Sequence, residues 1–168
     1  MKQEELDIIL ENHEKWLWGK GGKKADLSNT ELKNTNLRLI NLKLADLSNA
    51  DLRGANLRGA NLSNADLRGA DLSNTGLRDA SLKDADLSNA CLRGADLSNA
   101  YLRGANLSNA YLNWVNWQQV GGLTTIIVQV DTSRQNNQIA YIKELDILDW
   151  ESGALGNVRY WDEKEDEE

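Results

Sequence analysis

Two residue types with the chemistry of a catalytic or metal-binding group occur once each in this chain, as His13 and Cys91. A catalytic nucleophile needs a base within hydrogen-bond reach, and a zinc site needs three or four ligands. One histidine therefore excludes catalytic triads and multi-histidine metal sites, and the glycines recur at a fixed repeat position instead of forming a phosphate-binding turn. We predict that His13 is a hydrogen-bonded interfacial side chain and Cys91 an exposed free thiol. We expect no enzyme activity, no cofactor and no metal.

Leucine sets the organisation of the rest of the chain, because it occupies every fifth position from Leu27 to Leu112. Eighteen five-residue units run from Ala25 to Trp114, and a degenerate nineteenth follows at 115–119. A period of five fits neither a helix, with 3.6 residues per turn, nor a strand, which alternates every two residues. The backbone must therefore turn a corner every five residues. Repeats of this kind bury their apolar faces by stacking on their neighbours.

The consensus of the units is Ala-(Asp/Asn)-Leu-(Ser/Arg)-(Asn/Gly), and it resembles the pentapeptide-repeat family over residues 25–119. The resemblance implies an all-β solenoid: a right-handed quadrilateral β-helix with one unit per side and about 4.75 coils. The sequence before the repeats is also similar to short family members from Gram-positive bacteria and their phages. The best-known members resemble B-form DNA in shape and charge, and they bind DNA gyrase, either inhibiting it or protecting it from quinolones.

The residue types of one unit agree with this geometry. Alternate residues of a short extended side point inward and outward, so the leucine and the alanine two residues before it face the core. Asparagine and glycine at the fifth position suit a corner that needs unusual backbone angles. The sequence contains no proline, as expected where backbone N–H groups pair on both sides of a strand.

Four segments are predicted along the chain. They are an N-terminal capping helix and linker (1–24), the β-helix (25–119), a β-rich C-terminal cap (120–161) and an acidic, disordered tail (162–168). Residues 3–18 form an amphipathic pattern whose apolar face suits a lid on the first coil. The apolar face consists of Leu6, Ile9, Leu10, His13 and Leu17.

The C-terminal cap is expected to contain a β-hairpin. Two stretches rich in strand-forming residues, 124–130 and 138–150, flank a polar, turn-prone segment at 131–137. Five aromatic residues are candidates to cover the open end of the coils: Trp114, Trp117, Trp150, Tyr160 and Trp161.

The net charge of −7 is unevenly distributed. Residues 1–24 carry five acids and five bases, and residues 25–119 carry ten of each, whereas residues 120–168 carry eleven acids and four bases. A rod that replaces a polyanionic duplex should be acidic along its length. A gyrase-directed DNA mimic is therefore the second interpretation, and direct nucleic-acid binding is not expected because no face is strongly basic.

The first to fourth sides begin with the units at 25–29, 30–34, 35–39 and 40–44, and every fourth unit returns to the same side. Sorting the units in this way predicts one acidic wall. Four aspartates, Asp26, Asp46, Asp66 and Asp86, fall on the first side, against a single Arg68. One interpretation is that the solvent-exposed positions of the repeat have varied without any functional consequence. The other is that the column docks the basic surface of a partner protein.

Two leucines, Leu39 and Leu44, hold the fifth position of their units, where Gly, Asn or Asp is usual. Either the N-terminal helix or its linker folds over them, which is the interpretation we favour, or they form an exposed apolar spot for a partner.

The sequence as a whole favours a rigid, non-enzymatic protein-binding scaffold. The partner is unidentified, DNA gyrase being one candidate, and the sequence leaves open whether the protein is a monomer or a homodimer. A single cysteine excludes an internal disulfide and suits the reducing cytoplasm. No apolar stretch is long enough to span a membrane, and no secretory leader is recognisable before the helix.

Overall fold

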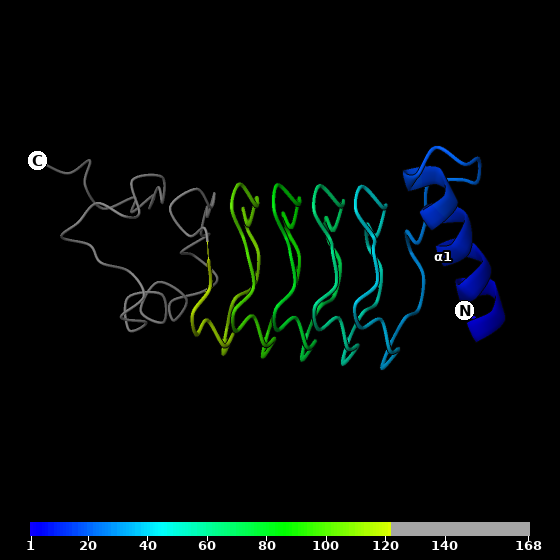
Figure 1. Ribbon diagram of the computed structural model, residues 1–168. Helices are drawn as coiled ribbons and strands as arrows, with labels where there is room; N and C mark the ends of the chain where they lie inside the picture. Colours follow the sequence, from blue (N-terminus) through cyan, green and yellow to red (C-terminus); the bar gives the residue numbers. More distant parts are fainter. Residues whose placement is uncertain (122–168) are drawn as a thin grey trace, which may run out of the picture.

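The computed structural model describes residues 1–121, which form one helix followed by a stack of coils (Figure 1). Helix α1 spans Gln3–Leu17. From Ala25 a five-residue backbone pattern repeats without interruption to Gly121. The predicted C-terminal hairpin, the acidic tail, Trp150, Tyr160 and Trp161 lie outside the described residues.

The coils stack in a register of twenty residues. Asp46 pairs in parallel with Asp26 on one side and with Asp66 on the other. The Leu47 N–H donates to the Asp66 carbonyl at 2.7 Å, and the Asp66 N–H donates to the Ala45 carbonyl at 3.0 Å. Each unit is thus hydrogen-bonded to the coil before it and the coil after it, as expected for a β-solenoid.

The walls differ from ordinary sheets in one respect. Pairing within residues 1–121 is limited to isolated bridges, each followed by a turn. A five-residue side has room for one bridge before the chain reaches the next corner. The predicted sides are therefore too short to count as regular strands, although their hydrogen bonds are of the strand type.

The corners depend on a positive φ angle. At every fifth position from Asn29 to Gln119, φ lies between 54° and 73°. A β-turn leads through each corner, as where the Leu47 carbonyl accepts a hydrogen bond from the Ala50 N–H at 3.1 Å. Glycine, asparagine and aspartate reach this region most easily. The corners that use another residue are Leu39, Leu44, Trp114 and Gln119.

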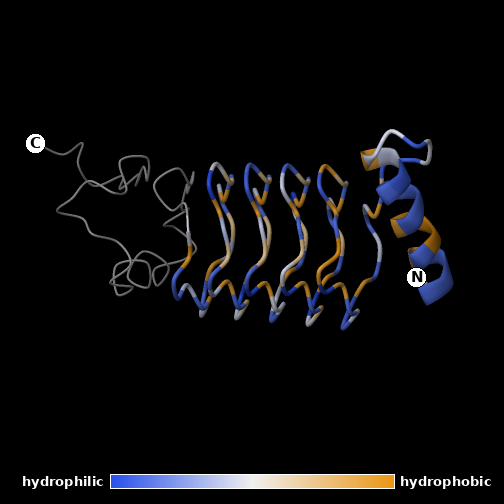
Figure 2. Ribbon diagram, viewed as in Figure 1, coloured by the Kyte–Doolittle hydropathy of each residue, from blue (hydrophilic) through white to orange (hydrophobic). Residues whose placement is uncertain are grey.

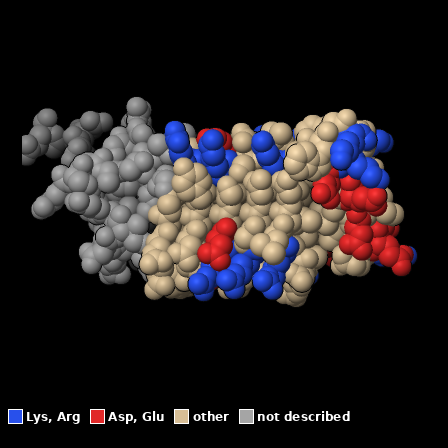
Figure 3. All heavy atoms as spheres, viewed as in Figure 1, with Lys and Arg blue, Asp and Glu red and all other residues tan. Residues whose placement is uncertain are grey.

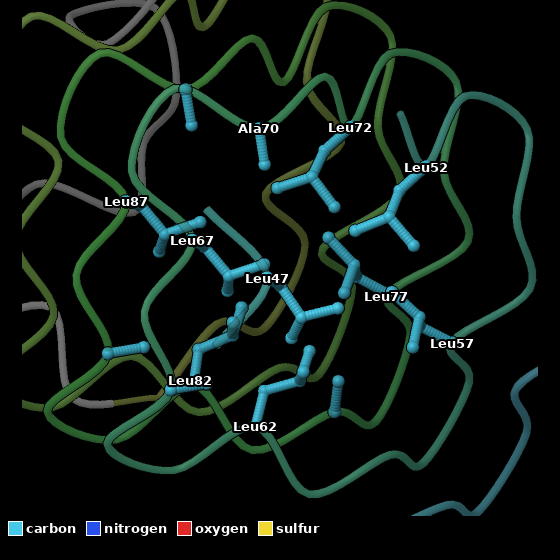
Figure 4. Close-up of a cluster of buried hydrophobic side chains, with 14 of the residues drawn as sticks. Leu47, Leu52, Leu57, Leu62, Leu67, Ala70, Leu72, Leu77, Leu82 and Leu87 are labelled. Carbon is cyan, nitrogen blue, oxygen red and sulfur yellow. The ribbon is translucent and has the colours of Figure 1, made fainter. Parts of the chain in front are cut away.

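The interior is a ladder of leucines. Every repeat leucine from Leu27 to Leu112 has at most 2% of its surface exposed. Figure 4 shows Leu47, Leu67 and Leu87 in one row with their side chains pointing into the tube. Figure 2 shows the resulting alternation of apolar and polar residues along each coil. Each buried leucine contributes about 2 kcal/mol, as an upper value against an extended chain.

Helix α1 lies across the N-terminal end of the coils (Figure 1). Its Leu6 and His13 are buried, and Ile9 and Leu10 are partly buried against the leucine core. In later coils the alanine N–H donates to the carbonyl of the leucine three residues earlier. No leucine lies three residues before Ala25. The Ala25 N–H donates instead to Nδ1 of His13 at 3.0 Å.

Candidate functional site

The outward surface begins with the Asp or Asn that precedes each leucine. Asp46 Oδ1 accepts the Ser48 N–H at 2.9 Å and the Ser48 hydroxyl at 2.7 Å. Asn61 Oδ1 accepts the Ser63 N–H at 3.0 Å in the same way. The side-chain oxygen thus closes a local turn in front of the corner. Since an amide and a carboxylate make this turn equally, the fold does not dictate where charge is placed.

The acidic wall, which we define as Asp26, Asp46, Asp66 and Asp86, forms one continuous column. Parallel bridges join its members in sequence, and they continue to Asn106, whose amide donates to Asp86 Oδ1 at 3.2 Å. Asp26 is exposed and the other three aspartates are half-buried. The structure therefore brings together the residues that the sequence places on the first side.

Two carboxylates of the acidic wall have lowered pKa values with different causes. Hydrogen bonds from the Ser28 hydroxyl and backbone lower the pKa of Asp26. The Arg68 guanidinium lowers the pKa of Asp66 chiefly by hydrogen bonding, and its Nη2 lies 2.5 Å from Asp66 Oδ2. Both groups are therefore ionised at neutral pH, and Arg68 neutralises the middle of the wall.

The second side carries a network of ion pairs. Asp51 Oδ2 lies 3.1 Å from Lys33 Nζ and 2.7 Å from Arg53 Nη2, and Arg53 Nε lies 3.6 Å from Asp71 Oδ2. The hydrogen bond from Arg53 holds the pKa of Asp51 well below its usual range. A shallow depression of about 340 Å³ opens beside this network, lined in part by Asn34. Its cations are already paired with carboxylates, which disfavours an anion site.

The third side shows similar pairing. Asp79 Oδ2 lies 3.3 Å from Arg58 Nε and 3.7 Å from Arg78 Nε. Figure 3 shows a face on which uncharged residues form a broad band between groups of Lys and Arg side chains. This face of the coils therefore carries no uniform charge of either sign (Figure 3).

The expectation that α1 or its linker covers Leu39 and Leu44 is wrong. Leu39 is 76% exposed and Leu44 is 40% exposed. Helix α1 buries Leu6 and His13 at the end of the tube instead, while a positive φ at each corner directs the leucine side chain outward. Trp114 is likewise 74% exposed at its corner, whereas Trp117 takes a core leucine position and is 5% exposed.

His13 and Cys91 do not come together in a site. Cys91 is half-buried, contrary to the expectation of an exposed thiol, because its Sγ lies 3.1 Å from the Ser73 hydroxyl of the preceding coil. His13 is fully buried, its ring stacks on Trp16 at 5.7 Å, and its Nε2 has no hydrogen-bond partner within residues 1–121. The expectation of a hydrogen-bonded His13 thus holds for one of its two ring nitrogens.

Burial lowers the pKa of His13, and the charge of Lys24 adds to this shift. Residues 1–121 hold no group of three or more His, Cys, Asp or Glu side chains placed to bind a metal ion. In the same part of the chain, no helix has the length and apolar character needed to cross a bilayer.

A solenoid of five-residue units around a leucine core defines the class of this protein. The family model described as pentapeptide repeats matches residues 23–59, 45–84 and 80–116, which together span more than half of the 168 residues. The chain therefore belongs to the pentapeptide-repeat family.

Solved structures of the same kind come from several sources. The chain is similar to a pentapeptide repeat protein from the Arabidopsis thaliana thylakoid lumen, with 27% identity over 70% of this chain and 74% of that one, and a TM-score of 0.43. A pentapeptide repeat protein from Nostoc PCC 7120 is 37% identical over 71% and 77% of the two chains, with a TM-score of 0.33. For QnrB1, a plasmid-mediated fluoroquinolone resistance protein, the identity is 20% over 70% of each chain, with a TM-score of 0.32. A comparison with curated proteins gave no match.

Proposed function

We propose that this protein is a rigid, non-enzymatic scaffold that binds a basic surface of another protein through the acidic wall. The supporting observation is the column of four stacked aspartates, since asparagine closes the same turn elsewhere in the coils. Adjacent carboxylates in such a column repel each other across a spacing of about 4.8 Å. Within residues 1–121, Asp66 alone of the four forms an ion pair, with Arg68. A cationic surface on a partner protein would offset the repulsion between the carboxylates of the acidic wall.

The rest of the molecule suits a scaffold better than an enzyme. Backbone hydrogen bonds link each coil to its neighbours, which gives a stiff rod with side chains at fixed spacings. In this proposal the coil is right-handed with about 4.75 turns, and α1 caps its N-terminal end. The protein acts in the reducing cytoplasm.

The test uses a substitution that removes charge and keeps the turn. Asp46→Asn with Asp66→Asn retains an acceptor oxygen at both positions, so thermal unfolding should change little. A matched control, Glu31→Gln with Asp71→Asn, removes the same charge from the second side. Affinity capture from the native host should recover a basic protein with the wild type and the control, and lose it with the acidic-wall variant.

Two results would contradict the proposal. One is equal recovery of every partner by the wild type and the acidic-wall variant. The other is loss of the partner in the second-side control alone, which would move the binding surface away from the acidic wall.

The second candidate, a DNA mimic directed at gyrase, has less support. Residues 25–119 carry ten acids and ten bases, and Asp51, Asp71 and Asp79 on the second and third sides form ion pairs with arginines. A duplex substitute needs unneutralised negative charge along the rod. A DNA supercoiling assay decides the matter: inhibition of gyrase, or its rescue from a quinolone, at micromolar protein would favour the mimic.

A further inference from the structure

Leu39 and Leu44 occupy the two corners that bound the fourth side of the first coil. Their φ angles are 58° and 66°, and their exposed fractions are 76% and 40%. A leucine in the left-handed region is strained, and burial does not offset this strain where the side chain lies in solvent. Backbone strain of this kind clusters at functional sites, and neighbouring exposed apolar side chains rimmed by polar residues suit a protein contact.

The Leu39 side chain lies over a glycine at the corner of the next coil, as other corner side chains do. A Cβ atom at Gly59 would lie 2.7 Å from Leu39 Cδ2, so this side chain lies directly over the glycine. Leu39 is therefore seated along the wall and presents a defined apolar surface.

Positive charge accompanies the two leucines. Arg38 and Lys43 are both exposed, and no acid within residues 1–121 forms an ion pair with either of them. The outward residues on this side of the first two coils are uncharged apart from Lys43: Asn41, Asn61 and Ser63. The nearest carboxylate along the chain, Asp46, lies beyond the next corner in the acidic wall, where its Oδ1 binds Ser48.

We propose that Arg38, Leu39, Lys43 and Leu44, together the first-coil patch, dock an acidic segment of another protein that carries aliphatic side chains. The two leucines would contact the aliphatic groups, and the two cations would pair with the carboxylates. This surface goes beyond the proposed scaffold function, because its charge is opposite to that of the acidic wall. A partner bound here is chemically distinct from one bound there.

The experiment measures peptide binding to the full chain by fluorescence anisotropy. The probe is a fluorescein-labelled pool of heptapeptides that alternate Asp or Glu with Leu, Ile or Val, and its counterpart carries Asn and Gln instead of the acids. We expect the acidic pool to bind the wild type with a dissociation constant below about 1 mM. Leu39→Asn with Leu44→Asn should weaken binding about tenfold, and raising the salt concentration should weaken it as well.

The chain offers matched controls for both parts of the patch. Asparagine is the usual corner residue, so the double leucine variant should fold, and Trp114→Asn makes the same kind of change at a remote exposed corner. Arg38→Gln with Lys43→Gln should weaken binding, whereas Lys83→Gln with Arg103→Gln, later on the same side, should not. Wild-type failure to bind at millimolar peptide, or equal binding by the leucine variant, would overturn the proposal.

Sedimentation velocity of the full chain separates another protein from a second copy. Monomeric profiles for both the wild type and the leucine variant agree with the proposal. A wild-type dimer that the leucine variant loses would refute it by assigning the first-coil patch to self-association.

Discussion

The side chain of one corner residue lies over the corner of the next coil, and this contact gives a sharp test of the register. Asn49 and Gly69 occupy successive corners of the same column. A Cβ atom at Gly69, where φ is 67°, would lie 2.5 Å from Asn49 Oδ1. Gly19 has a similar φ of 64°, but nothing lies within 4 Å of the position of its Cβ.

These two glycines separate backbone strain from side-chain crowding. Gly19→Ala should lower the free energy of unfolding by about 1–2 kcal/mol, the cost of a Cβ in the left-handed region. Gly69→Ala carries the same cost and also displaces the Asn49 side chain from its rotamer, which adds about 1 kcal/mol. Adding Asn49→Gly to Gly69→Ala removes the crowded side chain, so the double variant should recover the loss of about 1 kcal/mol caused by crowding. The coupling energy between the two positions should therefore be about 1 kcal/mol.

Guanidinium denaturation followed by far-ultraviolet circular dichroism measures five chains: the wild type, the single variants Gly19→Ala, Gly69→Ala and Asn49→Gly, and the double variant Asn49→Gly with Gly69→Ala. Gly19→Ala supplies the reference for strain alone. Equal losses at Gly19 and Gly69, together with no coupling between Asn49 and Gly69, would show that these corners do not stack as described.

Two further predictions concern the core and the buried histidine. Leu67→Asp places an unpaired carboxylate in a fully buried site and should abolish cooperative unfolding measured by circular dichroism, whereas Arg68→Asp on the exposed neighbour should leave a folded protein; a folded Leu67→Asp chain would contradict the core assignment. His13 has a folded pKa below its usual value, so its contribution to stability is complete above about pH 6.5 and is lost as the pH falls through the folded pKa. Because the chain has one histidine, proton NMR reads this pKa directly, and denaturant unfolding should show a pH slope that His13→Gln removes. A measured pKa at or above the ordinary histidine value would disprove this account.

The repeat itself was readable from the sequence because period and residue type agree. Leucine at every fifth position predicted the core, and Asn or Gly at the fifth position predicted corners with unusual backbone angles; both predictions are confirmed. The family assignment is confirmed as well. The closer likeness to short members from Gram-positive bacteria and phages stays a prediction.

Features that depend on contacts between distant segments were harder to predict from the sequence. The apolar face of α1 shows which side of the helix is buried but not where the helix lies on the coil, so the lid contact with Leu39 and Leu44 was wrongly expected. The half-buried state of Cys91 depends on Ser73 in the preceding coil. The turn closed by Asp or Asn was missed, although its signal was present in the fixed spacing between that residue and the Ser or Arg two positions later.

The twenty-residue register also limits how such a chain can change in length. Deleting one pentapeptide, for example 65–69, would leave each remaining unit able to form its own turn and bury its own leucine. Every later unit, however, would move by a quarter of a revolution, so that Asp86 would no longer align with Asp46. Gains or losses that preserve an aligned surface must therefore come in whole coils, and shorter ones redistribute every downstream outward side chain among the four faces.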